Sequence, residues 1–148
     1  MEERFQTFTV LIAKISRSIR KIKSEEMEEY ELKSPHVSCL YYLFKEESLT
    51  AKELCDICQE DKASISRSLE YLEERGFLIC ESNLKKRYKS LLKLTEKGKD
   101  IAKKIGDKID AVLEIASKGL SDENRAILYQ SLTLISNNLD LFCKKYGG

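Results

Sequence analysis

The segment DKASISRSLEYLEERG, residues 61–76, contains serines and an arginine at a spacing that suits hydrogen bonding to a ligand from one face of a helix. Within it Ile65, Leu69 and Leu72 recur at helical spacing. With about 100° between successive helical residues, Arg67 points away from that apolar stripe. Arginine pairs with guanine in the major groove of DNA, and serine donates to a base or a phosphate. The segment therefore predicts a helix whose outer face offers hydrogen-bonding groups to a nucleic acid.

The first turns of this helix carry small or polar groups on the outside. Ala63 points directly outward, and Ser64 and Ser66 lie on the flanks of the outer face. A helix enters the major groove, about 12 Å wide, only if its outer side chains let it approach. Asp61 is expected to cap the helix and Gly76 to end it in a left-handed conformation. The alternative is an ordinary surface helix whose polar groups contact only water.

A basic segment follows between two short apolar stretches, residues 77–80 and 91–94, that are typical of strands. This pattern predicts a β-hairpin with a charged tip. A flexible basic arm can lie along phosphates or reach a minor groove, and each neutralised phosphate releases counterions. The alternative is a turn that merely improves solubility. The basic residues of the tip are Lys85, Lys86, Arg87 and Lys89.

Charge is distributed unevenly along the chain, although the net charge is only +1. Residues 24–60 contain ten acids and three bases, a net charge of −7, whereas residues 83–99 contain seven bases and one acid, a net charge of +6. A concentrated basic segment favours a polyanionic partner, although a charged run is more often a solvated face.

Cysteine and histidine offer a second kind of chemistry. Cys55 and Cys58 form a C-x-x-C motif on a predicted helix, but a zinc site needs two further ligands and no second C-x-x-C supplies them. His36, the only histidine, lies one helical turn from Cys39. Five cysteines, an odd number, do not indicate the disulfide framework of a secreted domain. We expect buried reduced thiols, no metal and no cofactor.

Composition excludes several classes of protein. One histidine, the absence of a phosphate-binding glycine loop and the absence of a nucleophile with an evident base predict that the chain is not an enzyme. No apolar run reaches the roughly 18 residues of a membrane span, and no signal peptide is evident, which favours a cytoplasmic location and no membrane partner. With 6 glycines and 1 proline in 148 residues, the chain is expected to be mostly helical.

Long helices are predicted at both ends of the chain. The first, from Phe5 to about Glu31, has apolar residues in alternating steps of three and four, as in a coiled-coil seam. The last has an apolar face too wide for one seam, which indicates burial on more than one side and hence a second subunit. We expect dimerisation through Phe5, Phe8, Ile12, Ile15, Leu128, Leu132, Ile135, Leu139 and Phe142.

Shorter elements are predicted between these long helices. Ser34 is expected to cap a helix ending near Lys45, with Val37, Leu40, Tyr41 and Phe44 buried. Thr50 and Glu53 fit a capping box for a helix ending near Cys58. Because that helix and the helix after Asp61 are joined by only a few residues, the pair predicts a helix-turn-helix. A further helix is expected from Thr95 to about Lys118, and another after a cap at Ser121.

The ordered set of motifs resembles the MarR family of winged-helix transcriptional regulators over essentially the whole chain. The motifs are Ser34-Pro35-His36, LTAKEL at 49–54, LEERGFL at 72–78 and LTEKG at 94–98. The resemblance implies a homodimer built from the first and last helices, a recognition helix at 61–75 and a wing at 80–93 that reaches the minor groove. Many members brace the wing arginine with an Asp-x-Arg pattern. Here Arg87 follows two lysines, so that bracing is not implied.

The resemblance also implies a site residue set and partners. The recognition-helix positions are Lys62, Ala63, Ser64, Ser66 and Arg67, with Arg67 ranked first as the reader of a base. The expected partners are double-stranded DNA, a second copy of the chain and a small phenolic or other lipophilic effector, since family members often bind one. Repression is the commoner mode in the family.

The sequence thus predicts a mainly α fold of about six helices with a two- or three-stranded β wing, in one domain spanning 1–148. Within it we expect dimerisation helices at about 4–31 and 121–146, a winged helix at about 34–95 and a linking helix at about 96–118. The hypothesis is a homodimeric regulator of transcription on a near-palindromic operator. Two alternatives stay open: a winged helix that binds proteins through its acidic half, and a thiol- or metal-responsive DNA-binding sensor.

Overall fold

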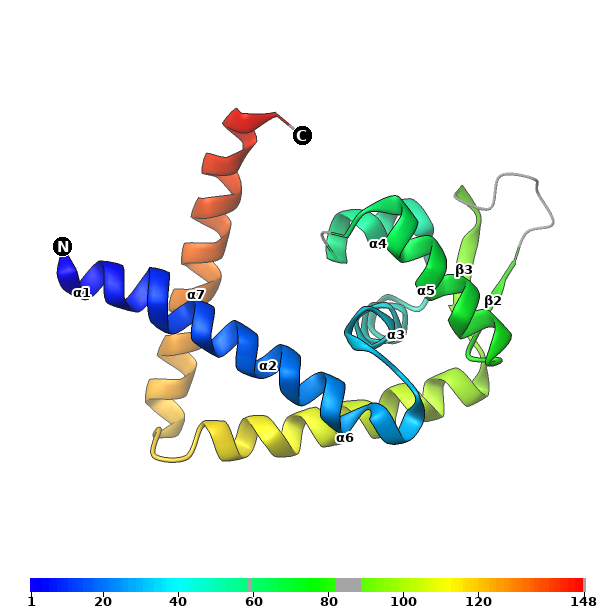
Figure 1. Ribbon diagram of the computed structural model, residues 1–148, viewed down its shortest axis with the longest axis horizontal. Coiled ribbons are helices and arrows are strands. Elements are labelled where there is room, and N and C mark those ends of the chain that lie inside the picture. Colours follow the sequence, from blue (N-terminus) through cyan, green and yellow to red (C-terminus); the bar gives the residue numbers. More distant parts are fainter. Residues whose placement is uncertain (59, 82–88, 148) are drawn as a thin grey trace. The chain divides into compact units, whose positions relative to one another are not determined.

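The computed structural model describes residues 1–58, 60–81 and 89–147 of a mainly helical chain (Figure 1). The chain divides into two compact units, Met1–Ile109 and Asp110–Gly148. Helix makes up 78% of the structure, and three short strands form the wing, as the sequence predicts. Across the described residues, no helix combines the length and the apolar character that a membrane span requires.

The first long helix is continuous in the ribbon but not uniform (Figure 1). It begins as α1 (Glu2–Phe5), passes through a π-helical stretch η1 (Gln6–Leu11) and continues as α2 (Ile12–Glu26). It ends five residues before the predicted Glu31. Met27 and Leu32 turn into the core there, and the amide of Leu32 donates to the carbonyl of Met27 at 3.2 Å. A single turn, η2 (Glu28–Tyr30), fills the bend.

Helix α3 (Ser34–Glu46) corrects two predictions. Lys33, not Ser34, occupies the N-cap position, and its amide donates to Nδ1 of His36 at 2.9 Å. Tyr41 and Phe44 are about half exposed, at 55% and 50%, whereas Cys39 and Leu43 are fully buried beside Val37 and Leu40. Rotation explains Tyr41, because at about 100° per residue it lies outside the arc formed by the buried residues of α3. Phe44 lies on the same side as the buried residues, but in the last turn of the helix.

The predicted helix-turn-helix consists of α4 (Ala51–Cys58) and α5 (Lys62–Glu74). The capping box at α4 is confirmed, because the amide of Glu53 donates to Oγ1 of Thr50 and the amide of Thr50 donates to Oε1 of Glu53, both at 3.1 Å. Asp61 caps α5, and Gly76 ends it with a φ of +77°. Local chemistry alone is sufficient to predict these boundaries.

The wing is a three-stranded antiparallel sheet in the order β1-β3-β2. Strands β2 (Leu78–Cys80) and β3 (Leu91–Leu94) pair with Cys80 opposite Leu92, and β1 (Leu49–Thr50) pairs on the other edge with Leu49 also opposite Leu92. The buried side chains of Leu49 and Leu92 join the sheet to the core under the helices. The largest fully buried side chains are Met27, Leu40, Leu43, Leu54, Ile65, Leu72, Leu78 and Leu92.

Helix α6 (Glu96–Ala116) begins at a close backbone contact. Oγ1 of Thr95 accepts from the amide of Gly98 at 3.0 Å and donates to the carbonyl of Gly76 at 2.6 Å. A Cβ at Gly98 would lie 1.9 Å from the carbonyl oxygen of Phe77, so only glycine fits. The LTEKG motif therefore attaches the start of α6 to the end of α5.

Lys108 holds α6 against the bend after α2. Its Nζ pairs with the carboxylate of Glu29, lies 3.7 Å from that of Glu26 and sits 5.3 Å from the centroid of the Tyr30 ring. The hydrogen bond from Lys108 lowers the pKa of Glu29 and raises that of Lys108. Glu29 is exposed and Lys108 is partly exposed, so this ion pair contributes little to stability.

The second unit contains the end of α6 and helix α7 (Asp122–Cys143), followed by a short turn, η4 (Lys144–Tyr146). Gly119 has a φ of +96° in the connection, and the predicted cap is confirmed because Oγ of Ser121 accepts from the amide of Asn124 at 3.1 Å. Arg125 joins the two helices through its ion pair with Glu114. No residue of α7 is buried in the single chain.

Candidate nucleic-acid interface

Helix α5 has one buried and one exposed face, as the sequence predicts. Ile65, Leu69 and Leu72 are at most 5% exposed, and Ser68 is buried with them. This apolar anchoring fixes the rotation of the helix about its axis. Within the set predicted to contact DNA, the exposed members are Lys62, Ala63, Ser66 and Arg67, while Ser64 is half-buried.

The first turn of α5 is organised by its cap. The amide of Ser64 donates to Oδ1 of Asp61 at 2.6 Å, so the acid is engaged with the helix. That arrangement limits its repulsion of an approaching phosphate, because part of the carboxylate charge is offset by the helix N-terminus. Ala63 and Ser66 have small, exposed side chains, so another molecule can come close to the helix at these positions. Arg67 is also exposed and has a longer side chain.

A contact network at the other end of α5 is absent from the sequence-based predictions. The ring of His36 stacks on Tyr71, and Nη1 of Arg75 donates to the Tyr71 hydroxyl at 2.8 Å and to Oε2 of Glu31 at 3.2 Å. The Tyr71 hydroxyl in turn donates to the carbonyl of Glu31. The network fixes the recognition helix to α3 and to the bend that follows α2. Its sequence signals are the positions of Arg75 in the LEERGFL motif and of His36 in the Ser34-Pro35-His36 motif, which do not reveal that the two segments meet.

The arginine at the centre of this network also covers two rings. The guanidinium carbon of Arg75 lies 5.6 Å from the centroid of Tyr71 and 5.4 Å from that of Phe77. Burial lowers the pKa of His36, and the positive charges of Lys33 and Arg75 lower it further. The imidazole is therefore neutral at pH 7, with Nδ1 available to accept the Lys33 amide. Arg75 and His36 thus act as structural parts of the interface.

The described part of the wing is held at its base. Nζ of Lys93 pairs with Oε1 of Glu81 at 2.8 Å across β2 and β3, and this hydrogen bond raises the pKa of Lys93. The amide of Glu81 donates to the carbonyl of Leu91 at 2.9 Å. Lys89 is exposed just before β3. The predicted tip residues Lys85, Lys86 and Arg87 lie outside the described residues.

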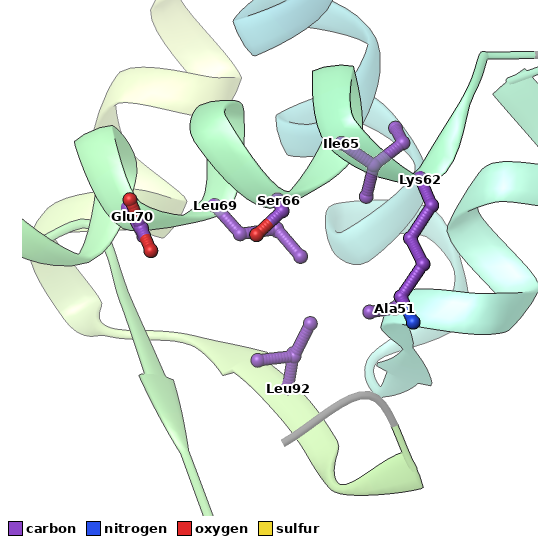
Figure 2. Close-up of a pocket in the computed structure, with 7 residues that line it drawn as sticks. All are labelled: Ala51, Lys62, Ile65, Ser66, Leu69, Glu70 and Leu92. Carbon is purple, nitrogen blue, oxygen red and sulfur yellow. The ribbon is translucent and has the colours of Figure 1, made fainter. Parts of the chain in front are cut away.

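A hollow of about 200 Å³ lies where α5 meets the start of α4 and strand β3. Figure 2 shows Ile65, Leu69 and Leu92 facing this space, with the side chain of Lys62 extending along it toward Ala51. The floor is apolar and the rim carries charge. Two predicted DNA-binding residues, Lys62 and Ser66, line this hollow between α5 and β3.

The residues predicted to dimerise are almost all exposed in the single chain. On α1, η1 and α2 the exposed side chains are Phe5, Phe8, Ile12 and Ile15, and on α7 they are Leu128, Leu132, Leu139 and Phe142, with Ile135 partly covered. Continuous apolar stripes of this length are uncommon on the surface of a monomer and mark interaction sites.

The cysteines and the histidine do not form a metal site in the described part of the chain. Among those residues, no group of three His, Cys, Asp or Glu side chains is arranged to hold a metal ion. Cys55 and Cys58 lie on α4, as predicted, and Cys39 lies on α3. His36 is engaged with Lys33 and Tyr71 instead of Cys39.

Comparison with known proteins identifies similar sequences and folds. A family profile described as "winged helix DNA-binding domain" matches residues 36–113, more than half of the chain. That span contains the helix-turn-helix, the wing and most of α6. Comparison with curated protein sequences gives no match.

Solved structures match nearly the full length of the chain. A putative MarR family transcriptional regulator from Listeria monocytogenes, complexed with a 26mer DNA, is 25% identical and has a TM-score of 0.81 over 93% of both chains. A MarR family regulator from Neisseria meningitidis is 20% identical, with a TM-score of 0.74 over 97% of this chain and 98% of that one. MepR from S. aureus, in a complex with DNA, is 18% identical, with a TM-score of 0.75 over 90% of this chain and 97% of that one.

Proposed function

The chain belongs to the winged helix DNA-binding family as a MarR-type transcriptional regulator, and from this premise we propose that it acts as a homodimer on a near-palindromic double-stranded DNA site. The MarR family regulates transcription and is not enzymatic, in agreement with the sequence-based expectation. Two-fold symmetry of the protein matches half-sites roughly 10 to 10.5 base pairs apart, centre to centre.

The exposed first half of α5 is the observation that carries this proposal. Its inner stripe is buried, so Ala63, Ser66 and Arg67 face outward on a rigid helix. Arg67 is the main reader, because its guanidinium can pair with two acceptors of guanine at once. Ser66 and Lys62 donate to nearby bases or phosphates. Ser64 ranks below them because its side chain is half-buried and its amide is engaged with Asp61.

The wing contributes contacts to the phosphate backbone. Lys89 is exposed at its base, and the proposal assigns Lys85, Lys86 and Arg87, in the tip, to phosphates or to a minor groove. Concentrated positive charge in a segment next to a recognition helix increases affinity for any sequence and strengthens its dependence on salt. The wing therefore anchors the protein, and α5 supplies the sequence preference.

A second copy of the chain is the proposed cover for the two apolar faces. Each face is long, and each is exposed in the single chain: one on α1, η1 and α2, the other on α7. Leaving such surfaces in water is unfavourable by about 25 cal/mol for each Å² that a partner could bury. A self-complementary dimer buries both copies of both faces at once.

The proposed mode is repression, relieved by a small phenolic or other lipophilic effector. A hollow of about 460 Å³ supports this idea, because its lining combines the apolar side chains Ile12, Ile15 and Ile19 with polar and charged groups of both signs, Arg20, Lys23 and Glu60. The dimer is expected to exchange between conformations that differ in the distance between the two recognition helices. A ligand in this hollow changes DNA binding only if it has a higher affinity for one of these conformations. A screen of small phenolic and other lipophilic compounds for loss of DNA affinity, measured on the selected site, tests the effector.

The experiment that tests the function is selection of a preferred site from random duplexes, followed by binding measurements on that site and on a scrambled one. A specific regulator binds the selected site at least about 10³-fold more tightly at physiological salt. Affinity for the scrambled duplex should fall steeply as salt rises, because counterion release dominates nonspecific binding. A protein-interaction module that uses the acidic half, residues 24–60, shows neither preference nor that salt dependence, and such a result would refute the proposal.

A further inference from the structure

A third hollow, of about 340 Å³, lies where the end of α3 meets strand β3 and the start of α6. Ligand pockets are typically about 300 to 1,000 Å³ and mostly apolar, with a few polar groups that fix the orientation of the ligand. The described lining here consists of three apolar and three charged residues: Leu43, Phe44, Leu94, Glu47, Lys93 and Lys99. None of them lines the hollow beside α2 or the hollow beside α5.

The apolar part of this hollow has a buried base and an accessible ring. Leu43 is completely buried and Leu94 is 7% exposed, so both belong to the core. Phe44 is 50% exposed, although it follows Leu43 on the same helix. A half-exposed aromatic ring beside a hollow offers a face on which a second ring can pack.

The charges around the hollow are of both signs. Nζ of Lys93 pairs with Glu81 at 2.8 Å, and Nζ of Lys99 lies 3.5 Å from the carboxylate of Glu96. Neither acid is part of the described lining. In the described part of the chain Glu47 is the one charged lining residue without an ion pair. The pair at Lys99 is long and exposed, so it costs little to exchange for a ligand.

The backbone of Glu47 is strained. Its φ of +66° and ψ of −47° lie in a region that residues with a side chain rarely adopt. The amide of Ser48 donates to the carbonyl of Glu46 at 2.7 Å, which closes a three-residue turn around Glu47. Glycine would fit this turn without strain. Strained residues are concentrated where a side chain serves a ligand, and here the strain places a carboxylate on the rim of the hollow.

From the shape and charges of this hollow we infer that it binds a free α-amino acid with an aromatic side chain. The ligand ammonium pairs with Glu47, the ligand carboxylate pairs with Lys99, and the ring packs on Phe44. A simple anion would meet the carboxylate of Glu47, and a simple cation would meet the two lysines. A zwitterion satisfies both signs of charge, and its apolar side chain covers the apolar base.

Isothermal titration calorimetry of the full-length protein without DNA tests the ligand. L-phenylalanine should bind with a Kd below about 1 mM. Phenylpropanoate lacks the ammonium and phenylethylamine lacks the carboxylate, so each should bind roughly tenfold more weakly. A Kd for L-phenylalanine above that limit, or equal affinity for the three compounds, overturns the inference. Because DNA is absent, failure of the proposed DNA-binding function would leave this result unchanged.

Charge-removing variants assign the two ends of the ligand. Glu47→Gln should weaken the binding of L-phenylalanine roughly tenfold without weakening that of phenylpropanoate. Lys99→Ala should weaken the binding of L-phenylalanine without weakening that of phenylethylamine. Glu46→Gln, an exposed neighbour outside the described lining, is the matched control and should bind normally. Arg20→Ala, in the hollow beside α2, should also bind normally.

Two results with these variants would contradict the inference. Equal losses in Glu46→Gln and Glu47→Gln would show that no specific carboxylate holds the ammonium. Loss of binding in Arg20→Ala, with Glu47→Gln unaffected, would place the ligand in the hollow beside α2. Circular dichroism checks the fold of each variant. If Glu47→Gln is not folded, Glu47→Gly removes the same carboxylate and suits the positive φ, so it takes its place.

Discussion

The imidazole of His36 lies flat on the phenol ring of Tyr71, with ring centroids 4.4 Å apart and planes inclined by 13°. His36 is in the first turn of α3, whereas Tyr71 is in the second half of the recognition helix α5. The stack continues through the Tyr71 hydroxyl to the carbonyl of Glu31, in the bend after α2. The orientation of α5 is therefore coupled to the end of the long N-terminal helix.

Tyr71→Phe tests the polar part of this coupling. The substitution retains the stacked ring but removes the hydroxyl that donates to Glu31 and accepts from Arg75. We expect a loss of about 0.5 to 1.5 kcal/mol in the free energy of unfolding for each hydrogen bond that was made. Urea denaturation followed by circular dichroism measures the change. Tyr41→Phe, on the exposed side of α3, is the control and should be neutral; equal losses in both variants would exclude the network as the cause.

The titration of His36 predicts how stability depends on pH. Burial, followed by the charges of Lys33 and Arg75, lowers its pKa in the folded protein below the ordinary value of 6.5. In the window below 6.5 the unfolded chain binds a proton that the folded chain does not, so stability falls as the pH falls. Protonation of Nδ1 would also break the bond from the Lys33 amide.

The expected slope is at most about 1.4 kcal/mol for each pH unit. It should be seen between pH 7 and pH 5.5, above the range in which carboxylates such as Glu29 titrate. Denaturation midpoints across this window provide the measurement. Because His36 is the only histidine, His36→Asn should flatten the profile, and an unchanged slope in that variant would assign the dependence to another group.

Gly98 and Gly106 form a matched pair on α6. A Cβ at Gly98 would meet the carbonyl of Phe77 at 1.9 Å, whereas in the described part of the chain a Cβ at Gly106 would meet no atom within 4 Å beyond its own helical turns. Gly98→Ala should therefore destabilise the protein by about 1 to 3 kcal/mol or more, since backbone must move. Gly106→Ala should stabilise it by up to about 1 kcal/mol through helix propensity. Thermal unfolding of the two variants compares them directly, and equal melting temperatures would contradict the close contact.

Local patterns in the sequence predict most of the elements and the buried and exposed faces of α5. The caps at Asp61 and Ser121 and the capping box at Thr50 involve residues three apart, so their geometry is determined by the helix itself. The buried stripe of α5 follows in the same way from helical periodicity. These features depend little on how distant segments pack.

The sequence-based predictions are wrong or make no statement where the structure depends on contacts between distant segments. Tyr41 is apolar enough to be buried, but the rotation of α3 is decided by packing of Leu40 and Leu43 against other elements. The Tyr71 stack on His36 joins two different helices. Spacing along one helix carries no information about such partners.

Arg67 and Lys86 are predicted to have separable roles in DNA binding. Arg67→Ala should cost about 1 to 3 kcal/mol on the selected site and blur discrimination at one base position. Lys86→Ala should weaken binding to all sequences and reduce the salt slope by about one unit. Fluorescence anisotropy over a salt series, on specific and scrambled duplexes, separates the two effects.

A surface lysine away from the predicted interface provides the control for both variants. Lys103→Ala, on the exposed side of α6, removes one positive charge and should leave specificity unchanged. If Arg67→Ala and Lys86→Ala behave alike on both duplexes, the assignment of one as reader and the other as anchor is wrong.

Introducing a charge into each apolar face tests the proposed dimer. Phe8→Glu and Leu139→Glu place a carboxylate at positions that are 45% and 55% exposed in the single chain, so the fold of the protomer should tolerate both. In a symmetric dimer each substitution buries two charges, and burial of an unpaired charge is strongly unfavourable. Sedimentation velocity should therefore show monomers at concentrations where the wild-type protein is dimeric. Ile79→Glu, on the exposed face of β2 at 52%, is the control and should remain dimeric. If the wild-type protein stays monomeric at every concentration, the proposed binding to two half-sites is wrong. Two recognition helices spaced by one turn of DNA require a symmetric pair of chains.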